Sequence, residues 1–167
     1  MNFGEAPDYY RRFVDPIDVV CIRTAPMDEH GFFNFSGAVT YHKAMVERAK
    51  VVVVETSPAM PYVFGGEESV HASEVDFVID GGDEAPAELA NPPATDVDRK
   101  VAALIAGEVE DGACLQIGVG GMPNAVCTLL KEAGIRDLGI HTEMLVDGLI
   151  DLIEAGLVTG ARKTLNR

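Results

Sequence analysis

The order of elements expected in the last third of the chain constrains its fold most strongly. Residues 113–117 form an apolar run typical of a strand, and a glycine-rich turn follows at residues 118–122. Pro123 suits the first residue of a helix, and a second strand is expected at residues 138–141. Another amphipathic helix is expected at residues 145–155. Strand, helix, strand, helix in this order predicts parallel strands joined by a right-handed crossover, so the fold class is α/β.

The first two thirds of the chain also contain short apolar runs that read as buried strands. These runs lie at residues 18–23, 51–55 and 75–80. A helix is expected at residues 41–49, with Thr40 as its cap. The sequence therefore predicts open parallel sheets with flanking helices throughout the chain.

A proline-rich stretch at residues 85–95 is the best candidate for a linker between domains. It holds three prolines, and a helix is expected to begin just after it, near Asp96. We therefore expect one α/β unit at residues 1–92 and a second at residues 93–167.

Composition excludes several classes of function. The formal net charge is −14, from 27 acidic and 13 basic side chains, and such a surface repels nucleic acids and anionic membranes. The most apolar short run, residues 51–54, is far too short to span a bilayer. Cys21, Cys114 and Cys127 are far apart in apolar segments, which favours reduced, buried thiols. The expected location is the cytoplasm.

Two strand exits in the last third bring chemistry-bearing residues together. One exit leads from Ile117 into Gly118–Gly121, and the other carries His141, Thr142 and Glu143. Parallel strands joined by one crossover place both exits at the same carboxyl edge of the sheet, where open α/β sheets bind ligands. We therefore expect a carboxylate beside a run of unobstructed backbone N–H groups.

A carboxylate beside such donors suits nucleophilic acyl transfer, in which the N–H groups hold the developing oxyanion. A carboxylate, with a pKa of about 4.3, is a much better leaving group than a thiolate, with a pKa of about 8.5. Attack on a thioester is therefore uphill unless interactions with the rest of the substrate offset the cost.

The glycines and Glu143 can also be explained by structural roles alone. The glycines can serve a tight turn, and Glu143 can be a first-turn acid that stabilises a helix N-terminus, with Thr142 or Asp147 as the cap. The start of a dinucleotide fingerprint at Gly118 is interrupted by Pro123, which leaves a nucleotide-binding module as a weaker alternative. The four histidines lack metal-ligand spacing, so no metal site is expected.

Three segments resemble the acetyl-CoA hydrolase/transferase family, which includes 4-hydroxybutyrate and butyryl-CoA:acetate CoA-transferases. Residues 115–126 read LQIGVGGMPNAV, and residues 138–144 read LGIHTEM, followed by Asp147-Gly148. Residues 27–33, MDEHGFF, are similar to a family segment that enters the other half of the active site. Two neighbouring motifs at fixed spacing are far more specific than either motif alone.

The resemblance implies a role for each matching residue. Glu143 would attack the acyl-CoA and then carry CoA as a glutamyl thioester, beside an oxyanion and CoA-binding loop. That loop consists of Gly118, Val119, Gly120 and Gly121. His30, His141 and Asn124 are further candidates for substrate contacts.

The resemblance also implies the ligands and the larger protein. Coenzyme A, acyl-CoA and a small carboxylate would be substrates, with no permanently bound cofactor and no nucleic acid or membrane partner. Family members are much longer, so we expect the end of one CoA-transferase-like domain and the start of a second. A homo-oligomer or a companion chain is expected to supply missing segments. Hydrolysis of acyl-CoA, and an inactive structural or partner-binding fragment, remain open alternatives.

Overall fold

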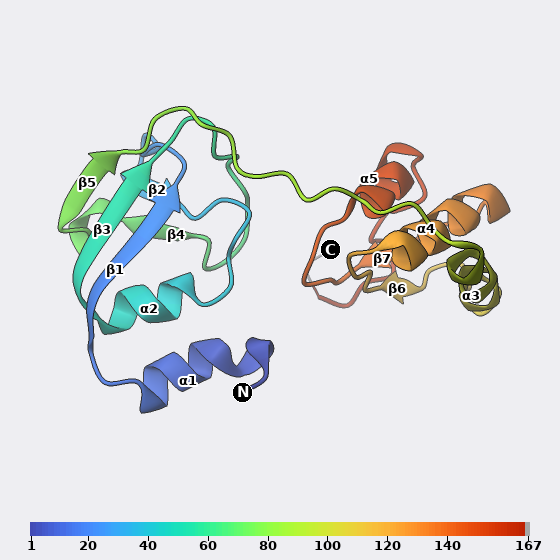
Figure 1. Ribbon diagram of the computed structural model, residues 1–167, viewed down its shortest axis with the longest axis horizontal. Helices are drawn as coiled ribbons and strands as arrows, with labels where there is room; N and C mark the ends of the chain where they lie inside the picture. The colour runs from blue at the N-terminus through green and yellow to red at the C-terminus, as the bar shows by residue number, and fades with distance from the viewer. Residues whose placement is uncertain (166–167) are drawn as a thin grey trace. The chain divides into compact units, whose positions relative to one another are not determined.

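The computed structural model describes residues 1–165 and divides into two compact units, Met1–Glu88 and Leu89–Arg167 (Figure 1). Each unit has its own hydrophobic core. The expected boundary after residue 92 lies shortly after this division. Both units contain helices and a parallel sheet, so the predicted α/β class is confirmed, although the first unit also holds an antiparallel pair of strands.

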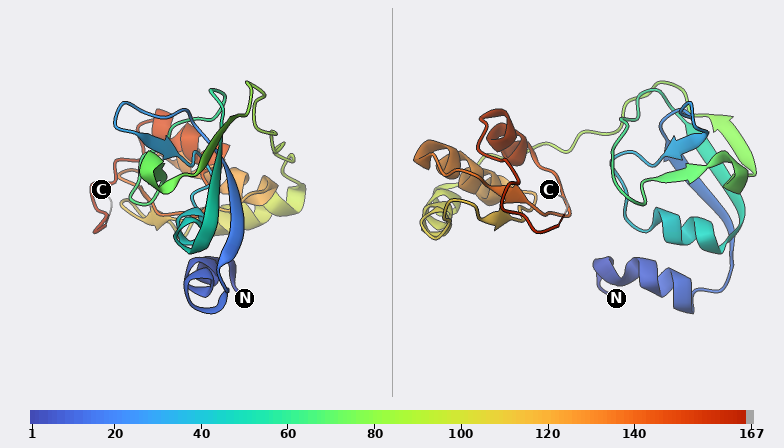
Figure 2. Two further views of the ribbon diagram at one scale, coloured as in Figure 1. Left: turned by 90° about the vertical axis from the view of Figure 1, so that its left-hand side faces the viewer. Right: turned by 180° about the vertical axis from the view of Figure 1, so that it is seen from behind.

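A three-stranded parallel sheet forms the centre of the first unit. Its strands are β1 (Ile17–Thr24), β3 (Ala49–Thr56) and β5 (Phe77–Asp80), in the order β1-β3-β5. Helix α2 (His42–Arg48) packs against β1 and β3, as Figures 1 and 2 show. The three expected strands are therefore confirmed. Thr40 is not the helix cap: Tyr41 holds that position, without a capping side-chain hydrogen bond.

Other elements of the first unit were not expected from the sequence. Helix α1 (Ala6–Phe13) follows a short 3₁₀ turn, Phe3–Glu5, and has Pro7 in its first turn. Strand β2 (Phe32–Asn34) pairs antiparallel with β4 (Ser69–His71), and a 3₁₀ turn follows β4 at Ala72–Glu74. Strands of three residues carry too little periodicity to be recognised from sequence.

Alternation along β1 decides which of its side chains are buried. Val20, Ile22 and Thr24 point into the core of the first unit, and Cys21 lies on the opposite, exposed face. The expectation that all cysteines are buried is therefore wrong for Cys21. It is also wrong for Cys114 in the second unit, whereas Cys127 is buried.

The second unit follows the predicted alternation of helices and strands. Its elements are α3 (Asp96–Ala106), β6 (Cys114–Leu115), α4 (Gly121–Ala133), β7 (Gly139–Ile140) and α5 (Asp147–Glu154). Strands β6 and β7 pair in parallel, which confirms the predicted crossover through α4. The strands are shorter than expected, and α4 begins two residues before Pro123.

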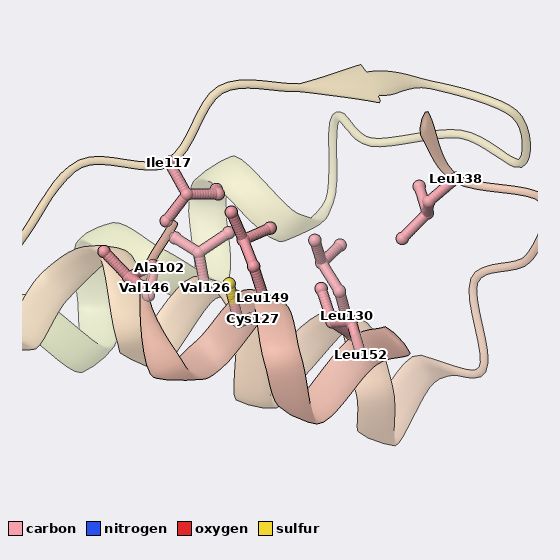
Figure 3. Close-up of a cluster of buried hydrophobic side chains, with 9 residues drawn as sticks. All are labelled: Ala102, Ile117, Val126, Cys127, Leu130, Leu138, Val146, Leu149 and Leu152. Atoms are coloured by element: carbon pink, nitrogen blue, oxygen red, sulfur yellow. The ribbon is translucent and has the colours of Figure 1, made fainter. Parts of the chain in front are cut away.

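Helices α3, α4 and α5 enclose the core of the second unit. Helix α4 contacts both α3 and α5, and the side chains shown in Figure 3 fill the space between these helices and the strands. Buried members of this core are Ala102, Ile117, Val126, Cys127, Leu130, Leu138, Val146, Leu149 and Leu152. Within the described part of the chain, no helix is long and apolar enough to cross a membrane.

Candidate active site

The glycine loop lies between β6 and α4. Gly120 is the N-cap of α4 and has φ of 141° and ψ of 170°, a backbone conformation that residues with a Cβ rarely adopt. No side chain caps the helix. Among the described residues, the N–H groups of residues 118–122 have no hydrogen-bond acceptor, and Pro123 has no N–H to offer. The loop therefore presents unpaired donors at the N-terminus of a helix of 13 residues.

The glycines of this loop differ in their surroundings. A Cβ on Gly121 would lie 3.1 Å from the Ala94 Cα and 3.1 Å from the Pro92 carbonyl oxygen. Gly121 therefore permits close packing of the 92–94 segment on α4, which is one of the structural readings of the motif. A Cβ on Gly118 would meet nothing within 4 Å, so packing in this unit does not require glycine there.

Thr142 joins the two strand exits. Its Oγ1 accepts a hydrogen bond from the Ile117 N–H at 3.3 Å. The same hydroxyl lies 3.1 Å from the Ile117 carbonyl oxygen and 3.0 Å from the Met144 carbonyl oxygen, both of which are acceptors for its proton. Ile117 is the residue before the glycine loop, and Glu143 lies between the two bonded residues, Thr142 and Met144. The sequence offered Thr142 or Asp147 as a helix cap, but this expectation is wrong, because the N-cap of α5 is Val146.

Glu143 is exposed at the carboxyl edge of the β6–β7 pair. Its carboxylate has no ion-pair or hydrogen-bond partner among residues 1–165. The segment that carries it runs from β7 to Val146, which is buried and precedes the first residue of α5. The carboxylate is thus free of internal partners while the chain on both sides of it is anchored.

The Asn124 side chain forms hydrogen bonds within the second unit. Its Oδ1 accepts a hydrogen bond from the Gly148 N–H at 3.3 Å, and its Nδ2 donates to the Asn91 Oδ1 at 3.0 Å. Asn91 in turn donates to the Asp147 carboxylate. The Asn124 amide therefore holds α4 against α5 with its oxygen and against the 91–94 segment with its nitrogen. Both polar atoms that would contact substrate are already hydrogen-bonded within the unit.

The two histidines proposed for substrate contacts lie in different units. The His141 backbone N–H donates to the Leu115 carbonyl at 2.9 Å, and its side chain borders a small cavity that Cys114 and Lys163 also line. His30 belongs to the first unit and has a side chain that is 75% exposed, 3.6 Å from the Glu29 carboxylate.

The turn that contains His30 is organised by Asp28. The Asp28 carboxylate accepts hydrogen bonds from the N–H groups of His30 and Phe32, each at 2.9 Å, and from the Tyr62 hydroxyl at 3.1 Å. Hydrogen bonding, led by the Phe32 N–H, lowers the pKa of Asp28 below its usual value. Asp28 lies in the 27–33 segment that resembles the family, but the bond from Tyr62 was not predicted, because it joins residues far apart in the sequence. In the described part of the chain, no group of three or more acidic, histidine or cysteine residues could hold a metal ion.

Comparison with known proteins gives a consistent set of relatives. Residues 1–88 match the sequence profile of the acetyl-CoA hydrolase/transferase N-terminal domain. The chain is 49% identical to butyryl-CoA:acetate CoA-transferase of Anaerostipes caccae, over 100% of this chain and 38% of that protein. It is 34% identical to 4-hydroxybutyrate coenzyme A transferase of Clostridium kluyveri, over 98% of this chain and 37% of that protein.

Solved structures agree with these sequence relatives. The 4-hydroxybutyrate CoA-transferase of Porphyromonas gingivalis superposes with a TM-score of 0.89 and 37% identity, covering 98% of this chain and 41% of that one. RipA of Yersinia pestis superposes with a TM-score of 0.91 and 39% identity, covering 99% of this chain and 37% of that one. The chain thus spans well under half the length of the relatives that it matches.

Proposed function

Because the chain belongs to the acetyl-CoA hydrolase/transferase family, we propose that it carries the nucleophile of a CoA-transferase, with Glu143 as the residue that becomes acylated. The observation that carries this proposal is the parallel pairing of β6 and β7, with Thr142 bonded to Ile117. This pairing supports a carboxylate and a set of unpaired N–H donors at one edge of one sheet. That combination suits nucleophilic acyl transfer, in which a carboxylate attacks a carbonyl and N–H donors hold the oxyanion.

In the first half-reaction, a Glu143 carboxylate oxygen attacks the thioester carbonyl of an acyl-CoA. The C–S bond breaks, which leaves a mixed anhydride on Glu143 and a CoA thiolate. The thiolate then attacks the glutamyl carbonyl and releases the acyl group as a free carboxylate. Glu143 now holds CoA as a thioester, and no atom or electron is left over.

The second half-reaction runs the same steps with the acceptor acid. The acceptor carboxylate attacks the glutamyl thioester, and the released CoA thiolate attacks the acyl carbonyl of the new anhydride. Products are the new acyl-CoA and a free Glu143 carboxylate. Each attack builds negative charge on a carbonyl oxygen, and the unpaired N–H groups of residues 118–122 are the donors that we assign to it.

Hydrolysis is the second candidate function. The chain is 35% identical, over 45% of its length, to an acetyl-CoA hydrolase of Yarrowia lipolytica. Transfer is favoured because relatives that match nearly the whole chain are described as CoA-transferases. The names of these two relatives, which include butyryl-CoA, acetate and 4-hydroxybutyrate, point to short acyl-CoA and carboxylate substrates. A product assay with and without acetate separates the two functions, since only transfer requires the acceptor.

Several further expectations stay predictions. They are a cytoplasmic location, the absence of a permanently bound cofactor, and a homo-oligomer or companion chain that completes the site. A nucleotide-binding module without catalysis is the alternative of another class. It predicts that Glu143→Ala changes ligand affinity and leaves no transfer activity to lose.

Substitution of Glu143 tests the proposed nucleophile. In the active enzyme that contains these residues, Glu143→Gln should keep the fold and lower kcat by about 10³-fold or more, because an amide cannot form the anhydride. Transfer is measured as acyl-CoA formed from a labelled carboxylate. The matched control is Glu154→Gln, at the exposed end of α5, which should leave the rate unchanged. Near-normal turnover in Glu143→Gln would remove this residue from the mechanism.

A further inference from the structure

The pairing between β6 and β7 continues past the end of the two strands through a side chain. Gly139 N–H donates to the Ala113 carbonyl and His141 N–H donates to the Leu115 carbonyl, each at 2.9 Å, as in a regular parallel ladder. At the next position the Thr142 hydroxyl bonds to both polar groups of the Ile117 backbone. The hydroxyl therefore extends the ladder to Ile117, the residue before the glycine loop.

One hydroxyl lies within hydrogen-bond distance of three backbone groups around the proposed nucleophile. Its oxygen accepts the Ile117 N–H, and its single proton is donated to the carbonyl of Ile117 or to that of Met144. The Ile117 carbonyl and the Gly118 N–H belong to one planar peptide unit, so a bond to the first fixes the direction of the second. The bond to Met144 spans Glu143 and constrains the backbone on both of its sides.

We propose that Thr142 is a positioning residue, whose hydroxyl sets the Glu143 carboxylate in register with the N–H donors of the glycine loop. This inference rests on the proposed acyl-transfer function and adds to it the residue that couples the two halves of the site. Thr142 acts through Ile117 and Glu143 and need not touch the substrate. Its contribution is to the rate of the covalent step, because misplacement of reacting groups by about 1 Å can cost about 10²-fold.

Two substitutions at Thr142 separate the hydroxyl from the bulk of the side chain. Thr142→Val keeps the shape of the side chain but leaves the Ile117 N–H and carbonyl without their partner. The glycine loop and the segment that carries Glu143 are then no longer joined by this hydroxyl. We expect kcat to fall by about 10- to 100-fold, with KM for the acyl-CoA within about twofold of the original. Thr142→Ser keeps the hydroxyl, and we expect its kcat to stay within about threefold.

The control is Thr159→Val, because Thr159 has a similar set of bonds away from the glycine loop. Its hydroxyl accepts from the Ala161 N–H at 3.2 Å and lies 3.4 Å from the Asp137 carboxylate. We expect this variant to keep its kcat. Single-turnover formation of the Glu143–CoA adduct is measured for each variant and expressed per active site, so that loss of folded protein does not count as loss of rate.

The outcomes test the role of Thr142 separately from that of Glu143. A slow adduct step in Thr142→Val, rescued in Thr142→Ser, supports the inference. A normal rate per active site in Thr142→Val, or an equal loss in Thr142→Ser, overturns it. Glu143→Gln is measured in parallel: if that variant still turns over, the proposed function fails; if it is inactive while Thr142→Val is normal, only the role of Thr142 fails.

Discussion

Cys114 and Cys127 belong to the same unit and differ in their surroundings. Cys127 lies on α4 and is 2% exposed, and a Cβ on Gly148, at the start of α5, would lie 2.9 Å from the Cys127 Cβ. Burial, with a smaller contribution from the charge of Asp151, raises the pKa of Cys127 to about 11. Cys114 is exposed, as is Cys21 in the first unit.

This contrast predicts an order of reactivity among the thiols. At pH 8, about 10⁻³ of Cys127 is thiolate if its pKa is about 11, and access to it is blocked. Iodoacetamide should therefore label Cys21 and Cys114 well before Cys127, as measured by peptide mapping over time. Labelling of Cys127 should rise only as the pH approaches 11 or the chain unfolds. Equal labelling of Cys114 and Cys127 in folded protein at pH 8 would contradict the buried assignment.

Helices α3, α4 and α5 have local signals that explain why they form where they do. Thr95 and Asp98 make a reciprocal capping box at the start of α3, with the Asp98 N–H bonded to the Thr95 hydroxyl at 3.1 Å. Helix α4 ends at Ala133, and its C-cap is Gly134, which has φ of 67°. At the start of α5, Gly148 lets α5 approach α4 closely, because a Cβ there would be 2.9 Å from the Asn124 Oδ1.

The close approach at Gly148 predicts a loss of stability on substitution. Gly148→Ala forces apart α4 and α5 at Asn124 and Cys127, and we expect the free energy of unfolding to fall by about 1–3 kcal/mol. The measurement is urea unfolding followed by circular dichroism. Gly107→Ala is the control, because φ there is −68° and its Cβ would make only ordinary contacts at 3.5 Å and beyond. An unchanged midpoint in Gly148→Ala would show that the two helices separate without cost.

Sequence reasoning succeeded at the element scale where signals are local. The parallel pairing of β6 with β7 follows from a strand, a helix and a second strand in order, and three strands of the first unit follow from their apolar runs. It failed where long-range pairing decides the outcome, as in the antiparallel pair β2–β4. Exposure of Cys21 depends on which face of the sheet is covered, and the bonds of Thr142 depend on the register of β6 against β7. Neither can be read from local pattern.

At the scale of the whole molecule, the chain consists of two units with separate cores. Glu143, the glycine loop and Thr142 all belong to the second unit, whereas the Asp28 turn belongs to the first. The assignment of these units to the end of one transferase domain and the start of the next stays a prediction. The two CoA-transferases compared above are more than twice as long as this chain, so the rate of transfer is measured on the active enzyme that contains these residues.

The central claim is that Glu143 becomes covalently attached to CoA, and intact-mass analysis tests it most directly. Active enzyme is mixed with acetyl-CoA, and the protein is weighed before and after and then digested for peptide mapping. We expect a mass increase equal to CoA with loss of water, located on the peptide that contains Glu143 and absent from Glu143→Gln. A CoA adduct on another residue, or steady turnover with no adduct at Glu143 under single-turnover trapping, would contradict the account.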